Sequence, residues 1–200
     1  MPTSFIRNSV RSILAAGALA IFSASIAQTD STKVQSEFDA IKPSEWTNSV
    51  APSIGSVSAP IKVVFFVDYE CPSCRTADAV VRQTIAKRSD VALIYREFPL
   101  YVHQFAKPAA IVAENARAHG TFNIAHKVLM EGKALTENSV KVAAHKAGVS
   151  TIATPAIASL LASDQAFEKK VKLTFVPCFI VIQNGKSPLM NKAQLLDFLK

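Results

Sequence analysis

The chain has 200 residues, half of them hydrophobic, with a formal net charge of +7 and three cysteines. This length allows one domain with an adequate core, and scattered lysines are typical of a solvated surface. No basic stripe interleaved with aromatic residues is present, which argues against a nucleic-acid partner.

Residues 1–27 predict a secretory signal peptide. Arg7 and Arg11 form a positive region, Ile13–Phe22 is a short apolar run, and small residues lead to Ala27, where we expect cleavage. The apolar run is only half of the roughly 20 residues that a membrane-spanning helix needs. We therefore expect an exported protein, either periplasmic or secreted.

The segment after the predicted signal peptide is polar, and it is followed by a predicted strand. Residues 28–57 should be exposed, with a short helix near Ser36–Ile41 and with Trp46 packed on the core. Ile61–Val67 is a continuous apolar run, which is typical of a strand buried on both faces of a sheet.

A helix and a second strand come next. The helical pattern begins at Pro72 and keeps an apolar stripe through Ala77, Val81 and Ile85, and Val91–Tyr95 is strand-like. A strand–helix–strand order at this spacing predicts a parallel, right-handed unit.

Residues 105–170 look helical throughout, and we treat them as an insertion within a single fold. Glycines and capping residues divide them. The first two expected helices are Ala109–His119 and Thr121–Gly132. A third is capped by Thr136 and ends at Ala147, and a fourth begins at Thr154 and Pro155. Asp164–Val171 either extends the fourth helix or forms a fifth.

The C-terminal segment predicts a hairpin and a helix: strand Phe179–Ile182, turn Asn184-Gly185, strand Ser187–Met190, and helix Lys192–Leu199 capped by Asn191. The order along residues 58–200 is therefore βαβ, a helical block and ββα, an α/β fold with a helical insertion.

The sequence Cys71-Pro72-Ser73-Cys74 follows directly on the first strand. A helix N-terminus favours the thiolate of Cys71, and Cys74, one turn further in, should be more buried and act as the resolving thiol. Pro72 suits the first helical turn, and the Ser73 hydroxyl can donate to the thiolate. A disulfide between Cys71 and Cys74 would close a very short loop and so would stabilise the fold little. A redox or metal-binding role is therefore favoured over a structural one.

Three segments together resemble the DsbA-like thioredoxin-fold family: Phe66–Cys74, Arg96–Leu100 and Val176–Val181. The resemblance implies a thioredoxin-like fold with an inserted helical domain, and a dithiol/disulfide site that exchanges disulfides with exported proteins. It also implies that Pro177 is a cis-proline beside the cysteines, which leaves the backbone of Val176 free to pair with an extended substrate.

One departure from the family concerns the proton of the inner thiol. Relatives often carry a buried acid where this chain has Phe65, so Asp68, Glu70 or water would have to replace it. The two acids also bring negative charge close to Cys71, which Arg75 could oppose.

The second departure is Cys178, where relatives commonly have Thr. Three roles are open for Cys178. It could be a small buried core residue, or it could tune exchange through an alternative disulfide with Cys71. It could also complete a Cu(I) or Zn site with Cys71 and Cys74.

Among the histidines, His103 is expected near the active face, and the other three are expected to be surface or partly buried residues: His119, His126 and His145.

We expect a monomeric thiol–disulfide oxidoreductase that needs no cofactor or metal. Its partners would be the thiols and disulfides of exported proteins and a redox partner that resets the Cys71–Cys74 pair. An oxidase, a reductase and an isomerase would use the same residues. The alternative is a non-enzymatic metal-binding or chaperone module using Cys71, Cys74 and Cys178.

Overall fold

The computed structural model describes residue 38, residues 40–48 and residues 50–200. The predicted signal peptide and half of the helix predicted near Ser36–Ile41 lie outside these residues. None of the described helices is both long and apolar enough to span a membrane.

Four strands form one sheet in the order β2-β1-β3-β4. The central strand β1 (Ile61–Val67) runs parallel to β2 (Val91–Glu97) and antiparallel to β3 (Cys178–Ile182), and β4 (Leu189–Met190) continues the sheet on the far side of β3. The predicted parallel unit is confirmed. Strand β2 is two residues longer than predicted, because the charged residues at its end are buried and paired rather than exposed.

The two faces of the sheet belong to separate hydrophobic cores. Side chains of a strand alternate between the faces, and the strands β1 and β3 follow this rule. One core contains Val63, Phe65, Val67, Phe179 and Val181. The other contains Val64, Phe66, Cys178, Ile180 and Ile182.

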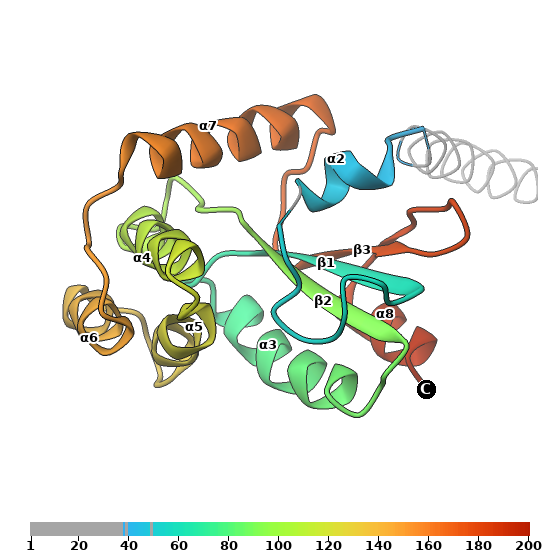
Figure 1. Ribbon diagram of the computed structural model, residues 1–200, viewed down its shortest axis with the longest axis horizontal. Coiled ribbons are helices and arrows are strands. Elements are labelled where there is room, and N and C mark those ends of the chain that lie inside the picture. The colour runs from blue at the N-terminus through green and yellow to red at the C-terminus, as the bar shows by residue number, and fades with distance from the viewer. Residues whose placement is uncertain (1–37, 39, 49) are drawn as a thin grey trace, which may run out of the picture. The chain divides into compact units, whose positions relative to one another are not determined.

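Helices α3 (Pro72–Ile85) and α8 (Lys192–Phe198) cover the first of these faces (Figure 1). Helix α3 buries its predicted apolar stripe there, and Leu195 of α8 lies in the same core. Asn191 caps α8 by accepting the backbone N–H of Gln194 at 3.0 Å, as predicted. The Asn184-Gly185 turn before β4 has two positive φ angles, 51° and 75°, as the hairpin signal requires.

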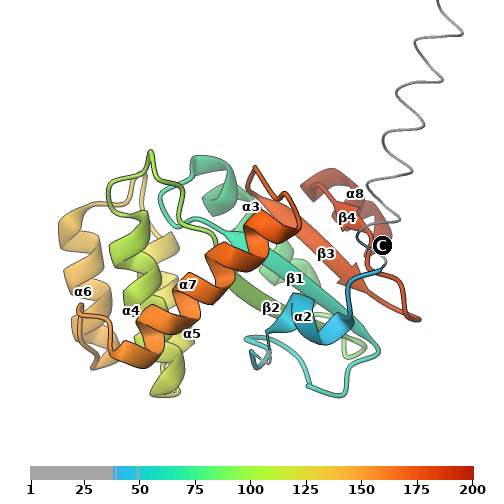
Figure 2. The same cartoon turned by 90° about the horizontal axis from the view of Figure 1, so that it is seen from above.

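Helices α2 (Pro43–Thr47) and α7 (Pro155–Lys170) cover the opposite face (Figure 2). Helix α7 is continuous, so residues 164–170 extend it rather than form a fifth helix. Trp46 is fully buried, as predicted, with its ring 5.3 Å from that of Phe167 and 6.3 Å from that of Phe66. Phe38 is also buried, so part of the segment expected to be exposed belongs to the core.

A buried ion pair ties α7 and α2 to the sheet. Arg96 of β2 bonds Asp164 of α7 at 2.5 Å, and both side chains are almost fully buried. Arg96 also donates to the carbonyl oxygens of Glu45 and Trp46, and Asn48 donates to Asp164. Arg96, a charged residue near the end of β2, therefore holds both α7 and α2 against this face of the sheet.

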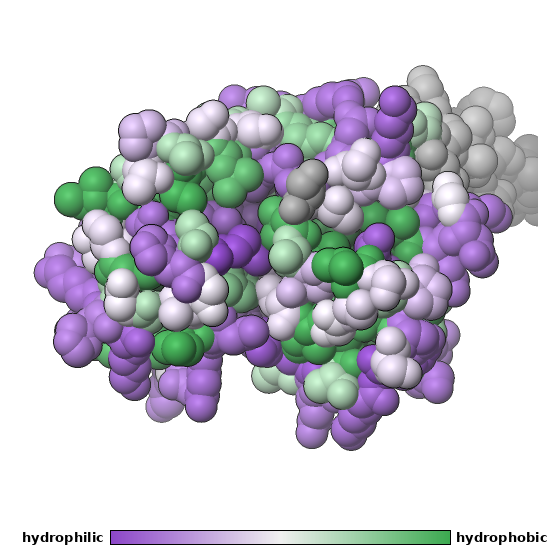
Figure 3. Space-filling view, in the orientation of Figure 1, coloured by the Kyte–Doolittle hydropathy of each residue, from purple (hydrophilic) through white to green (hydrophobic). Residues whose placement is uncertain are grey.

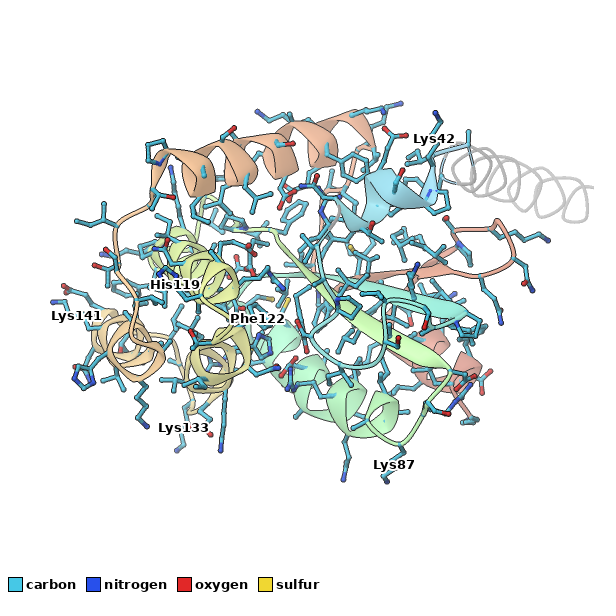
Figure 4. All side chains as sticks on the ribbon, in the orientation of Figure 1. Lys42, Lys87, His119, Phe122, Lys133 and Lys141 are labelled. Carbon is cyan, nitrogen blue, oxygen red and sulfur yellow. The ribbon has the colours of Figure 1, made fainter. Side chains whose placement is uncertain are left out.

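The remaining helices of the insertion, α4 (Ala106–Ala118), α5 (Phe122–Met130) and α6 (Glu137–Ala147), pack against one another beside the sheet (Figure 1). Thr136 caps α6 by accepting the N–H of Ser139 at 3.1 Å, as predicted. On the face in Figure 3, polar side chains surround small apolar areas. The labelled lysines in Figure 4 point outward from their elements.

Candidate active site

Cys71 lies at the junction of β1 and α3. The strand ends at Val67, and the carboxylate of Asp68 then accepts the backbone N–H groups of Glu70 at 2.7 Å and Cys71 at 3.2 Å. These bonds turn the chain into α3, where Cys71 is the N-cap and Pro72 the first helical residue. Cys71 makes no side-chain capping bond. Cys71 therefore lies at the N-terminus of α3, as expected, and its sulfur accepts no bond from the N–H groups of the first turn.

The two thiols of the motif are free and lie against each other. Cys71 lies close enough to Cys74 to help raise the pKa of its thiol, and the backbone of Asp68 opposes that effect. Cys71 is 9% exposed and Cys74 is fully buried, so the predicted order of burial is confirmed, although little of Cys71 is open to solvent. Burial is the main reason that the pKa of Cys74 is raised far above the ordinary thiol value.

A groove of about 540 Å³ runs beside the motif. Pro72 and Ser73 line it on one side, and Phe175, Val176 and Pro177 line it on the other. The Val176–Pro177 peptide bond is cis, as the resemblance implied. The structure therefore brings the segment before β3 to the motif, with the exposed ring of Phe175 at the same place.

Cys178 lies apart from this pair. It belongs to the core on the other face of the sheet, paired across β1 with Phe66, whereas Cys71 and Cys74 belong to the core under α3. Burial raises the pKa of its thiol, and the Glu168 carboxylate adds to this effect.

This placement corrects the metal-site alternative. Cys178 cannot join Cys71 and Cys74 around one ion while the sheet stands between them. Across the described part of the chain, no cluster of three or more Cys, His, Asp or Glu side chains could hold a metal. The same separation argues against a disulfide between Cys178 and Cys71, and favours the simplest interpretation of Cys178 as a buried core residue.

Phe65 occupies the position of the expected buried acid. Its ring packs against Tyr95 and Phe179, with centroid distances of 5.5 and 4.4 Å, and is fully buried. The acid is thus replaced by an aromatic contact that fills the core beneath the cysteines.

Arg75 does not act as the sequence suggested. Its guanidinium donates to the carbonyl oxygens of Tyr69, Leu129, Glu131 and Gly132. It thereby fastens the start of α3 to the end of α5, and the desolvation of its charge lowers its pKa. Its donors are directed at backbone carbonyls rather than at Cys71.

The loop after β2 is held by the two acids of the motif. Asp68 accepts the Leu100 N–H and bonds the ring Nδ1 of His103, both at 2.8 Å, and Glu70 accepts the Phe105 N–H at 2.6 Å. His103 therefore does lie at the active face, as expected.

A buried chain of hydrogen-bonded side chains behind the motif was not predicted from the sequence. His126 Nδ1 lies 3.0 Å from the Tyr69 hydroxyl, and His126 Nε2 lies 3.1 Å from Asp78, which also accepts a bond from Tyr95. His126 is 1% exposed, so the prediction of a surface or partly buried position was wrong. Its spacing from Phe122 and Leu129, which form the buried stripe of α5, was the available signal.

Burial lowers the pKa of His126, while Asp78 opposes that effect. Burial also raises the pKa of Glu97, which the Tyr69 hydroxyl approaches at 3.4 Å, and nearby Glu114 raises it further.

A thioredoxin family model matches residues 47–200, and the chain belongs to the thioredoxin family. A thioredoxin-like oxidoreductase from Silicibacter pomeroyi DSS-3 is 29% identical, with a TM-score of 0.65 over 78% of this chain and 95% of that one. Together these matches place the protein among the thiol–disulfide oxidoreductases.

Two further solved structures share the fold. A linker-deletion mutant of ScsC from Proteus mirabilis has a TM-score of 0.72 and 20% identity, over 96% of each chain. The thiol-disulfide exchange protein alpha-DsbA2 of Wolbachia pipientis has a TM-score of 0.64 and 14% identity, over 87% of this chain and 96% of that one. The predicted thioredoxin-like α/β fold is confirmed.

Among curated proteins, the Na(+)/H(+) antiporter NhaA 3 of Salinispora tropica is 38% identical over 77 residues. The match covers 38% of this chain and only 12% of the antiporter.

Proposed function

We propose that the protein is an exported, DsbA-like enzyme that exchanges disulfides with secreted protein substrates through Cys71 and Cys74. The observation that carries this proposal is the pair of neighbouring free thiols at the start of α3, beside the groove formed with Val176 and Pro177. Two cysteines one helical turn apart can form and break a disulfide without a change of fold.

The difference in exposure between the two cysteines supports an order for the steps of disulfide exchange. A substrate thiolate attacks the sulfur of Cys71 in the oxidised pair, because Cys71 alone of the two reaches solvent. A bond forms between the substrate and Cys71, and Cys74 leaves with the electron pair of the broken disulfide. A second substrate thiol then attacks the mixed disulfide, which yields an oxidised substrate and a reduced enzyme.

The groove supplies a place for the substrate chain. The Val176 backbone would pair with an extended segment, in the manner of strand addition. Phe175, which is 49% exposed, offers an apolar contact beside it. Pro72 and Ser73 close the other side of the groove and hold the substrate near Cys71.

Export is the second part of the proposal. The features of residues 1–27 support it, and an oxidising compartment is where a protein of this kind would meet substrates with disulfides. A redox partner must return the pair to its starting state, and a reductase or isomerase would run the same steps in another direction.

The test is exchange with a peptide that carries two thiols, using oxidised protein and the variants Cys71→Ser and Cys178→Ser. We expect Cys71→Ser to lose exchange and Cys178→Ser to keep it. Exchange that survives Cys71→Ser would overturn the proposal. For export, fractionation and N-terminal sequencing of the full chain should give a mature protein that starts at Gln28, and an uncleaved cytoplasmic chain would contradict that part.

A further inference from the structure

The groove beside the redox pair has a third wall, and what we infer from it rests on the proposed function. The start of α8 supplies this wall through Asn191, Lys192 and Ala193, which line the groove together with the motif and residues 175–177. Helix α8 also contacts α3, the helix that begins at the motif. A substrate chain that lies along Val176 toward Cys71 would therefore pass the first turn of α8.

Among the described residues that line the groove, Lys192 is the only charged one. It is partly buried, and it forms no ion pair within the part of the chain that the structure describes. The other residues that line the groove are neutral: Pro72, Ser73, Thr76, Phe175, Val176, Pro177, Asn191 and Ala193. A cation beside an otherwise neutral groove attracts a carboxylate on the chain that lies there and repels a second cation.

The backbone of Lys192 is held firmly in place. Asn191 accepts the N–H of Gln194 at 3.0 Å, and the Gln194 side chain accepts the N–H of Asn191 at 2.9 Å, which fixes the start of α8 from both sides. Leu195 and Leu199 anchor the same helix in the core under the sheet. The ammonium group therefore extends from a rigid element beside the groove.

No neighbouring acid neutralises Lys192 within the described residues. Residues 171–200, which form two of the three walls, contain a single acid, Asp197, and it bonds Lys200 at 2.8 Å. The one acid of α3, Asp78, is bonded to a buried histidine. Asp68 and Glu70 accept backbone N–H groups of the turn before α3 and of the loop after β2. The α8 side of the groove is therefore positively charged.

We propose that the groove selects substrate segments that carry an Asp or Glu side chain close to the reacting cysteine. The carboxylate of that side chain pairs with the Lys192 ammonium group while the substrate thiolate attacks Cys71. Lys192 touches none of the reacting sulfurs and is a specificity-determining residue. Because the pair is accessible to solvent, salt should weaken the preference.

The experiment uses peptides with blocked ends and two thiols, in pairs that differ only by a Glu or a Lys near the cysteines. Moving this residue through each position on either side of a cysteine locates the acid relative to the reacting sulfur. Oxidised protein is mixed with both peptides of a pair, and mass spectrometry of the oxidised products gives the ratio of their rates. A nearby charge also changes the reactivity of the thiol itself. The same ratio is therefore measured with hydroxyethyl disulfide, a small uncharged oxidant, and divided out.

At the best position we expect the wild-type protein to oxidise the Glu peptide about twofold to fivefold faster than the Lys peptide, which is the scale of an exposed ion pair. Lys192→Gln should abolish this preference, Lys192→Glu should reverse it, and Lys192→Arg should keep it. The matched control is Lys146→Glu, which changes an exposed lysine in the last turn of α6 and should keep the wild-type preference.

A merely structural effect of a Lys192 variant would change both rates equally, so the ratio reports the recognition of charge. The same ratio in the wild type and in Lys192→Glu would overturn the inference, and so would a wild-type protein that shows no preference at any position. In both cases disulfide exchange itself remains intact. If the wild type oxidises neither peptide, the proposed function fails, and this inference with it.

Discussion

The side chains of Cys178 and Phe66 lie opposite each other on one face of the sheet, while the Cys71–Cys74 pair lies on the other face. We therefore predict that Cys178→Ala leaves the reduction potential and the rate of exchange unchanged. The loss of a small buried side chain should lower the free energy of unfolding by about 1 kcal/mol.

The matched control is Cys74→Ala, which removes the resolving thiol and must abolish a measurable disulfide potential. A shift in the reduction potential of Cys178→Ala would show that the third sulfur is coupled to the pair across the sheet.

The three thiols should react with iodoacetamide in a fixed order. Cys71 is partly exposed, whereas Cys74 and Cys178 are fully buried and burial raises the pKa of each. Because the thiolate is the nucleophile, reduced protein at neutral pH should be labelled first at Cys71, and at the other two only after unfolding. Peptide mapping by mass spectrometry gives the order, and early labelling of Cys178 would contradict the structure.

Glu168 should make the fold less stable at alkaline pH. Burial raises its pKa to about 8, with a further contribution from nearby Asp164. Between the ordinary value of 4.5 and about 8, the folded protein holds a proton that the unfolded chain releases. The unfolded state then binds fewer protons, so the free energy of unfolding falls as pH rises through this range.

The variant Glu168→Gln stays neutral and should remove this contribution, which we place on the order of a few kcal/mol. Denaturant unfolding at several pH values measures it. Glu137→Gln, which changes an exposed acid on α6, is the control and should keep the wild-type slope. Equal slopes for Glu168→Gln and the wild type would refute the assignment.

The buried pair Arg96–Asp164 should be sensitive to the loss of one partner. Arg96→Met leaves the Asp164 carboxylate buried without its cation, which typically costs about 3–5 kcal/mol of unfolding free energy. Replacing both residues, as in Arg96→Met with Asp164→Leu, should recover much of that loss.

The exposed pair Lys141–Glu137 has a similar distance, 2.6 Å, and serves as the comparison. Lys141→Met should cost much less unfolding free energy than Arg96→Met, since water already solvates both charges. Similar losses for the buried and exposed pairs would contradict this account.

Periodicity and turn chemistry were enough to predict most of the fold. The run Ile61–Val67 is a strand with the predicted bounds, and the caps Thr136 and Asn191 start helices where expected. These signals are local, because they depend on residues only a few positions apart. The cis peptide before Pro177 was predicted only through the family resemblance, since nothing in the local sequence requires it.

The positions that were wrong depend on contacts across the chain. The sequence suggests that Arg75 opposes the acidic charge beside Cys71, yet three of its four partners are carbonyls more than fifty residues away. His126 is fully buried rather than at the surface or partly buried, because Tyr69 and Asp78 provide hydrogen-bond partners inside the protein. The face occupied by Cys178 depends on strand register, which the sequence did not provide.

The central claim is that Cys71 is the sulfur that bonds to the substrate. The most direct measurement uses Cys74→Ala, which cannot resolve a mixed disulfide, incubated with a peptide that contains a disulfide. Mass spectrometry after digestion should find the peptide attached to Cys71 and to no other residue. Attachment at Cys178, or no adduct under conditions in which the wild-type protein exchanges disulfides, would contradict the account.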